Sequence, residues 1–188
     1  MANTYHQIYL QTVFAVKYRN AVIDKKWRGL SSGKKEFTDI NALCGEYLRL
    51  AYHGLRAKDK CFNAKFETHF DPTLPKINAI SQDIGRVVLN LINNAFCAVN
   101  QQQEQLVVLS TRNLGDEIQI SEKDNGNGVP ENINEKIFQP FFTTRATGQG
   151  TGLELSLAYD IVTKGNGGEL NVTTQEGRGS EFIITLPS

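Results

Sequence analysis

Residues 147–156 read TGQGTGLELS, with glycine at every second position from 148 to 152 and an apolar, helix-favouring segment after them. A glycine-rich turn that leads into a helix presents backbone N–H groups that can bind phosphate oxygens. One residue conflicts with this pattern, because the carboxylate of Glu154 would repel a nearby phosphate. The stretch therefore predicts a nucleotide-binding loop that is weakened by one negative side chain, and other segments must supply the rest of the site.

Two asparagines upstream of this loop are candidates for a metal site. Asn90 and Asn94 lie one turn apart in a segment whose apolar residues recur at helical spacing, so we expect both to project from one helix face. A side-chain amide oxygen suits a Mg²⁺ ion that keeps most of its waters and contacts substrate phosphates. A structural polar face on the helix is the alternative, and it is the simpler one when the pair is taken alone.

Residues 124–128, DNGNG, end a strand-like segment. The carboxylate of Asp124 can accept a hydrogen bond from an exocyclic amine such as adenine N6, and neighbouring glycines let a ligand lie against bare backbone. An ordinary turn is the alternative, because Asn-Gly is common turn chemistry. Further on, residues 137–148, IFQPFFTTRATG, predict a hinged lid in which Arg145 offers a fixed charge to a phosphate. For the phenylalanines of this lid, packing in the core is the alternative.

The order of helix and strand patterns predicts an α+β fold with antiparallel hairpins late in the chain. Helices are expected from Asp39, with Thr38 or Asp39 as its cap, from Ser81 as the cap of a second helix, near 131–138, and at roughly 152–164. Strands are expected at 7–18, 64–70, 105–112, 117–124, 168–175 and 180–187, and the last four form two hairpins.

The length and composition of the chain place it among ordinary globular proteins. Its 188 residues suit one domain, and no apolar run approaches the roughly 18–20 residues of a membrane span. The N-terminus lacks the pattern of an export signal, so a cytoplasmic location is expected. Three cysteines without metal-type spacing are expected to be buried thiols. Residues 1–35 carry seven Lys or Arg against one Asp, which fits either a nucleic-acid-binding arm or a segment of different origin.

In combination, these motifs resemble a known family. VVLNLINNA (87–95), DNGNGVPENINEKIFQPFFTT (124–144) and GQGTGLELSLAYDIV (148–162) are similar, in order and spacing, to the asparagine, first glycine, phenylalanine and second glycine boxes of sensor histidine kinases. EGRGSEFIITLP (176–187) resembles the closing hairpin of the same ATP-binding catalytic domain. The resemblance covers about residues 36–188 and implies a two-layer α/β sandwich of the Bergerat type, with a mixed sheet and helices on one face. Gyrase, mismatch-repair and chaperone ATPases share this fold, and the QPFFTT lid favours the kinase branch.

The resemblance also implies roles for individual residues. Asn94 would hold Mg²⁺ with Asn90 near the metal and phosphates, Asp124 would bind adenine, and Arg145 would replace the usual lid lysine. The implied cofactor-binding residues are Asp124, Gly126, Gly128, Phe141, Thr144, Gly148, Gly150, Thr151, Gly152 and Leu153. The implied cofactors are ATP and Mg²⁺. Two positions depart from the family pattern: Cys97, where many relatives carry a basic residue, and Glu154, where the second glycine box usually has its last glycine.

The family's phosphate-accepting histidine motif does not match any histidine of this sequence. We therefore expect γ-phosphoryl transfer to a histidine on a dimerisation hairpin in trans, with a response regulator as an indirect partner. Residues 1–28 instead resemble the start of a single-tyrosine insertion-sequence transposase, so residues 1–35 are expected to be a fragment and junction. The alternative function is a catalytically idle ATP-binding remnant of a kinase gene fused to that fragment. Nucleic acid is not an expected partner, because only the basic N-terminus points to it.

Overall fold

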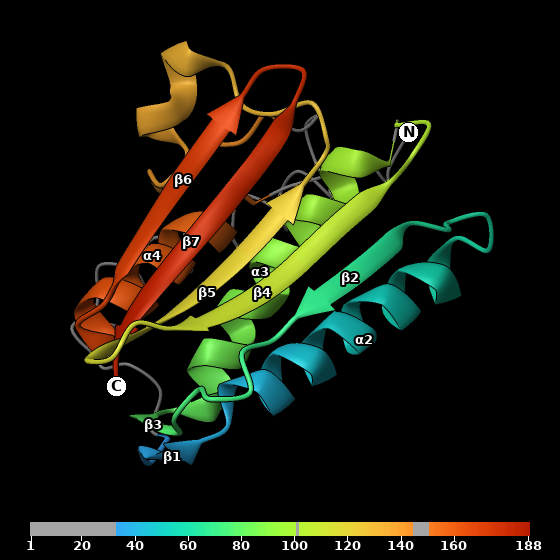
Figure 1. Cartoon of the computed structure of the whole chain (residues 1–188). Coiled ribbons are helices and arrows are strands. Elements are labelled where there is room, and N and C mark those ends of the chain that lie inside the picture. The colour runs from blue at the N-terminus through green and yellow to red at the C-terminus, as the bar shows by residue number, and fades with distance from the viewer. Residues whose placement is uncertain (1–32, 101, 145–150) are drawn as a thin grey trace, which may run out of the picture. The chain divides into compact units, whose positions relative to one another are not determined.

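The computed structural model of the chain describes residues 33–100, 102–144 and 151–188, and the described elements belong to one compact unit that begins at Lys34. The predicted strand at 7–18 and the transposase-like segment lie outside the described residues, so the predicted division of the chain stays a prediction. The unit has two layers, a sheet and a set of helices on one of its faces (Figure 1). This arrangement confirms the predicted fold class. Among the described helices, none is both long and apolar enough to cross a membrane.

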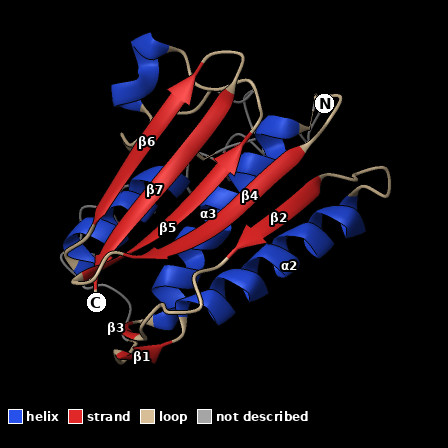
Figure 2. Cartoon of the chain, viewed as in Figure 1, coloured by secondary structure: helices blue, strands red, loops and turns tan. Residues whose placement is uncertain are grey.

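The five-stranded sheet has the order β2-β4-β5-β7-β6. Its strands are β2 (Lys65–His69), β4 (Leu106–Asn113), β5 (Glu117–Asp124), β6 (Glu169–Gln175) and β7 (Gly179–Pro187). β2 runs parallel to β4 and the other pairs are antiparallel, so the sheet is mixed as predicted. Both predicted hairpins, β4–β5 and β6–β7, are present (Figure 2).

The helix layer contains α2 (Ile40–Lys58), α3 (Ser81–Val99) and α4 (Glu154–Asp160), which continues as the π-helical segment η2 (Ile161–Gly165). A short 3₁₀ helix, η1 (Glu131–Lys136), stands where a short helix was expected. α4 begins later than the predicted residue 152, because Gly152 has φ +66° and lies outside the helical region. The predicted apolar face of α3 is buried, from Ile84 to Ala95.

One helix cap agrees with the prediction and the other does not. The carboxylate of Asp39 accepts a hydrogen bond from the N–H of Ala42 at 3.0 Å and so caps α2 as expected. The prediction that Ser81 caps α3 is wrong, because the helix begins at Ser81 itself and its hydroxyl donates to the Glu36 carboxylate at 2.9 Å. That contact follows from a small sheet that was not predicted, in which β1 (Glu36–Thr38) pairs with β3 (Ile77–Ala79).

The hydrophobic core lies between the sheet and the helices and fixes α3 against β5. Val87, Leu91 and Ile92 of α3 are almost completely buried, as are Ile118 and Ile120 of β5. Burial of each such side chain contributes about 1.5–3 kcal/mol relative to an exposed position. Because this packing is rigid, the polar residues at the end of β5 and on the adjacent face of α3 are held in fixed relative positions.

The expectation of buried cysteines holds for one residue of the three. Cys44 is buried in α2, and burial raises the pKa of its thiol to about 12. Cys61 and Cys97 are exposed, so the prediction is wrong for both. Cys61 follows the end of α2, and Cys97 lies on the polar side of α3 rather than on its apolar face.

Candidate functional site

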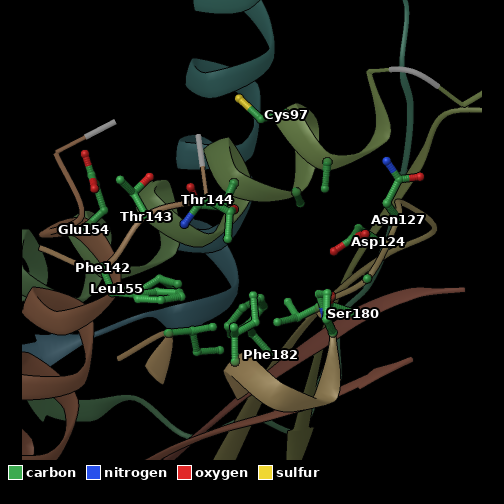
Figure 3. A pocket seen from close by; sticks show the side chains of 18 of the residues that line it. Cys97, Asp124, Asn127, Phe142, Thr143, Thr144, Glu154, Leu155, Ser180 and Phe182 are labelled. Carbon is green, nitrogen blue, oxygen red and sulfur yellow. The ribbon is translucent and has the colours of Figure 1, made fainter. Parts of the chain in front are cut away.

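A cavity of about 670 Å³ opens between α3, the end of β5, η1 and the start of α4. Its volume lies in the range of pockets that bind small molecules and cofactors. Figure 3 shows its side chains, with Asp124 and Glu154 toward opposite sides of the view. Five of the predicted site residues line it, namely Asn94, Asp124, Gly128, Thr144 and Gly152. Three segments far apart in the sequence therefore meet at one cavity.

The other predicted residues have different positions. Asn90, Gly126, Phe141, Thr151 and Leu153 belong to the same segments but do not line the cavity. Arg145, Gly148 and Gly150 lie outside the described residues, and so does the end of the predicted lid loop from residue 145 onward. Their roles stay predictions.

Asp124 ends β5 and is almost completely buried, with 4% of its surface exposed. Its Oδ1 accepts a hydrogen bond from the N–H of Gly126 at 2.7 Å. Burial raises the pKa of this carboxyl, while hydrogen bonds from the backbone N–H groups of Gly126 and Ser180 act in the opposite direction, and burial prevails. The local turn thus fixes the orientation of the carboxyl group at the wall of the cavity.

The glycines that follow Asp124 allow close contact between backbone segments. A Cβ atom on Gly126 would lie 2.7 Å from the carbonyl oxygen of Ala98 in α3. Gly128 has φ +67°, and a Cβ atom there would collide with the carbonyl oxygen of Gln175 at the end of β6. The structure therefore gives these glycines a packing role, and their predicted place beside an adenine ring stays a prediction.

The two asparagines of α3 differ in their surroundings. Asn94 lines the cavity, where its amide oxygen is chemically suited to a hard cation that also contacts phosphates. Asn90 instead donates its side-chain N–H to the backbone oxygen of Glu154 at 3.2 Å, which ties α3 to the start of α4. Cys97, one turn beyond Asn94, lines the cavity as an exposed thiol (Figure 3).

Phe141 and Gly152 join the base of the predicted lid to the glycine loop. The N–H of Phe141 donates to the carbonyl oxygen of Gly152 at 2.7 Å, and both residues have positive φ, +67° and +66°. A Cβ atom on Gly152 would lie 2.5 Å from the carbonyl carbon of Phe141. Phe138 and Phe142 pack against the core, whereas Phe141 is exposed, so the packing alternative holds for the first two.

The Glu154 carboxylate is held at the start of α4. It accepts hydrogen bonds from the Thr151 hydroxyl at 2.7 Å and from the Leu153 N–H at 3.2 Å. Partial burial acts to raise the pKa of Glu154, but the hydrogen bonds from Thr151 and the backbone outweigh it and lower that pKa. A negative charge therefore stands at the cavity near neutral pH.

A second buried acid, Glu122, lies two residues before Asp124 on the same face of β5. It is 1% exposed, and neither carboxylate oxygen has a hydrogen-bond partner among the described residues. Burial raises the pKa of Glu122 well above its usual value, and repulsion from Asp124 and Glu181 adds to this. Glu122 has the same parity along β5 as the apolar residues Ile118 and Ile120, and this alternation is the sequence signal that could have indicated its burial.

Much of the cavity wall was not predicted from motifs. Its apolar part includes Val129, Ile137, Leu155 and Phe182, and Ser180 lies beside Asp124 across the β5–β7 pair. The β7 residues become part of the site only because β7 pairs with β5, and no local sequence motif predicts this pairing.

The comparisons with known proteins agree with this geometry. Residues 79–188 match the family described as histidine kinase-, DNA gyrase B-, and HSP90-like ATPase. Sensor histidine kinase ZraS of Escherichia coli (strain K12) is 35% identical over 79% of this chain, which spans 30% of the length of ZraS. The catalytic domain of histidine kinase ThkA superposes with a TM-score of 0.65 and 31% identity, covering 81% of this chain and 95% of that domain.

A further solved structure, full-length ShkA in complex with AMPPNP, shares the fold with a TM-score of 0.70 at 24% identity, covering 84% of this chain and 32% of ShkA. The family match includes α3, the end of β5, the start of α4 and β7, which are the elements that build the cavity. The chain therefore belongs to the family of histidine kinase-, DNA gyrase B- and HSP90-like ATPases.

Proposed function

We propose that the chain binds Mg·ATP in this cavity and is the catalytic domain of a two-component sensor histidine kinase. The observation that carries the proposal is the meeting of Asp124, Asn94 and the start of α4 around one cavity. The acceptor would be a histidine on a dimerisation hairpin in trans, and a response regulator would take part indirectly. The family match and the kinase relatives support this choice of reaction.

The residues present fit an adenine nucleotide. Asp124 would accept a hydrogen bond from the exocyclic amine of adenine, with apolar contacts from Ile137 and Phe182 in the same cavity. Asn94 would hold Mg²⁺, and Thr144 and Gly152 line the cavity where the phosphates are expected. Mg²⁺, when bound, would neutralise charge on the phosphates, since positioning and charge stabilisation dominate phosphoryl transfer. The chain's own contribution is to orient the nucleotide and to restrict water at the reacting end.

Binding is tested by titrating the full chain with ATP in the presence and absence of Mg²⁺. Asp124→Ala should abolish binding with or without Mg²⁺, and Asn94→Ala should remove the Mg²⁺-dependent part. Asp116→Ala and Asn171→Ala are matched controls, because both residues are exposed and neither lines the cavity. Equal affinities for wild type and both site variants would contradict the proposed site.

Phosphoryl transfer needs a separate experiment with labelled ATP and a separately supplied acceptor hairpin. Acid-labile label on the hairpin, lost with Asn94→Ala, would support the kinase reaction. ATP binding without transfer to any hairpin would favour the alternative, a catalytically idle ATP-binding module.

A further inference from the structure

Glu154 lines the cavity, and its carboxylate occupies hydrogen-bond donors of the adjoining residues Thr151 and Leu153. Its Oε1 accepts from the Thr151 hydroxyl at 2.7 Å and its Oε2 from the Leu153 N–H at 3.2 Å. Both oxygens of the carboxylate are therefore engaged by the glycine loop itself. The backbone of Glu154 is also fixed, because its carbonyl oxygen accepts from Asn90 at 3.2 Å.

The Glu154 carboxylate and a phosphate group would compete for the same hydrogen-bond donors. Thr151 and Leu153 are two of the cofactor-binding residues that the family resemblance implies, and a phosphate could bind the Thr151 hydroxyl and the Leu153 N–H only after displacing the carboxylate. A phosphate that binds nearby also meets an ionised Glu154, whose charge has the same sign. An adenosine moiety held at Asp124 meets neither obstacle, because Asp124 and Glu154 lie toward opposite sides of the cavity (Figure 3).

We propose that Glu154 is a specificity-determining residue that lowers the preference of the cavity for phosphorylated adenine nucleotides over adenosine, by acting as an internal substitute for a phosphate. This inference rests on the proposed function and concerns the same cavity. The carboxylate group of Glu154, and not the absence of a glycine at this position, is then the cause of the lowered preference for phosphorylated nucleotides. Removing the negative charge while keeping the length of the side chain should therefore already change the selectivity.

The experiment compares adenosine, ADP and ATP, each titrated with Mg²⁺ into the full chain. The variants are Glu154→Gln, which removes the charge, and Glu154→Gly, which removes the side chain; Glu46→Gln, on the exposed side of α2, is the control. We expect the ratio of ATP affinity to adenosine affinity to rise about tenfold in Glu154→Gly, equivalent to about 1.4 kcal/mol. The rise in Glu154→Gln should be smaller but several-fold, since the amide can still accept one of the two hydrogen bonds.

The outcomes separate this inference from the proposed function. An unchanged ATP-to-adenosine ratio in both variants overturns the inference and leaves nucleotide binding intact. A rise in Glu154→Gly alone overturns it too, because the effect would then come from backbone freedom and not from the carboxylate. Failure of all three adenine probes to bind any of these proteins would refute the proposed function itself.

Discussion

Glu122 makes the stability of this domain depend on pH in a direction opposite to that of most acidic residues. Its side chain is fully enclosed and neither oxygen is hydrogen-bonded within the described part of the chain, so the folded protein holds it in the protonated, neutral form. The unfolded chain releases this proton near the usual pKa of 4.5. Folding is then coupled to the uptake of one proton over the interval between the two pKa values.

The sign and size of the effect follow from proton linkage. Because the folded pKa is raised, the contribution of Glu122 to stability is fully present below the unfolded pKa and is lost as the pH rises toward the folded pKa. Within that interval the free energy of unfolding falls by about 1.4 kcal/mol per pH unit. Glu122→Gln removes the proton equilibrium while it keeps a similar shape. The stability of Glu122→Gln relative to wild type should therefore grow by about that amount for each pH unit above about 4.5, until the pH reaches the raised pKa of the folded state.

The assay is urea denaturation of wild type and variants at a series of pH values from about 4 to about 8. Glu117→Gln is the matched control, since Glu117 lies on the same strand and is exposed. Glu122→Leu should be more stable than wild type at every pH, by about 1–3 kcal/mol near pH 4, because it removes two unsatisfied oxygens without a large change of volume. A constant difference between Glu122→Gln and wild type across the whole series would refute the reasoning.

Other predictions follow from individual contacts. Gly152→Ala should destabilise the domain by about 1–2 kcal/mol in thermal or urea unfolding, because an alanine is strained at φ +66° and its Cβ would press on the backbone of Phe141. Gly54→Ala, at a helical position with open space around the new Cβ, should stabilise it by about 0.5–1 kcal/mol in the same measurement. The side-chain hydrogen bond from Thr73 and the backbone N–H groups of Asn113 and Thr73 lower the pKa of Asp71. The ionised Asp71 therefore stabilises the folded state at pH values above its unfolded pKa, and this stabilisation is lost as the pH falls through its folded pKa. Asp71→Asn should accordingly be less stable than wild type at pH 7, with the deficit shrinking in acid denaturation curves.

Elements with a strong local pattern were predictable from the sequence. α3 was predicted because apolar residues recur at helical spacing from Ile84 to Ala95, and all of that face is buried. The two hairpins were predicted because each joins β-rich segments through a short polar or glycine-containing turn. The capping of α2 by Asp39 was likewise a local signal, since an Asp side chain before a helix can bond to the first free N–H groups.

Features that depend on tertiary contacts were not predictable in this way. β1 and β3 have three residues each, too few for a periodic pattern, and their pairing draws the Ser81 hydroxyl to Glu36 instead of to its own helix. The walls contributed by β7 follow from strand order, because Ser180 and Phe182 are opposite Asp124 and Glu122 only through the β5–β7 register. Strand order in a mixed sheet is set by the whole core and not by any one segment.

The glycines of the motifs cannot by themselves report on ligand binding. Gly126 and Gly128 permit contact with the backbones of α3 and β6, and Gly152 permits contact with Phe141. Replacing any of them would displace the walls of the cavity, so a loss of binding would be expected whether or not the glycine touches a ligand. Substitutions at Asp124 and Glu154 that keep the side chain polar and of similar volume leave these backbone contacts of the glycines intact. A change of nucleotide selectivity in such variants, with an unchanged melting temperature, can therefore be assigned to the chemistry of the cavity and not to its collapse.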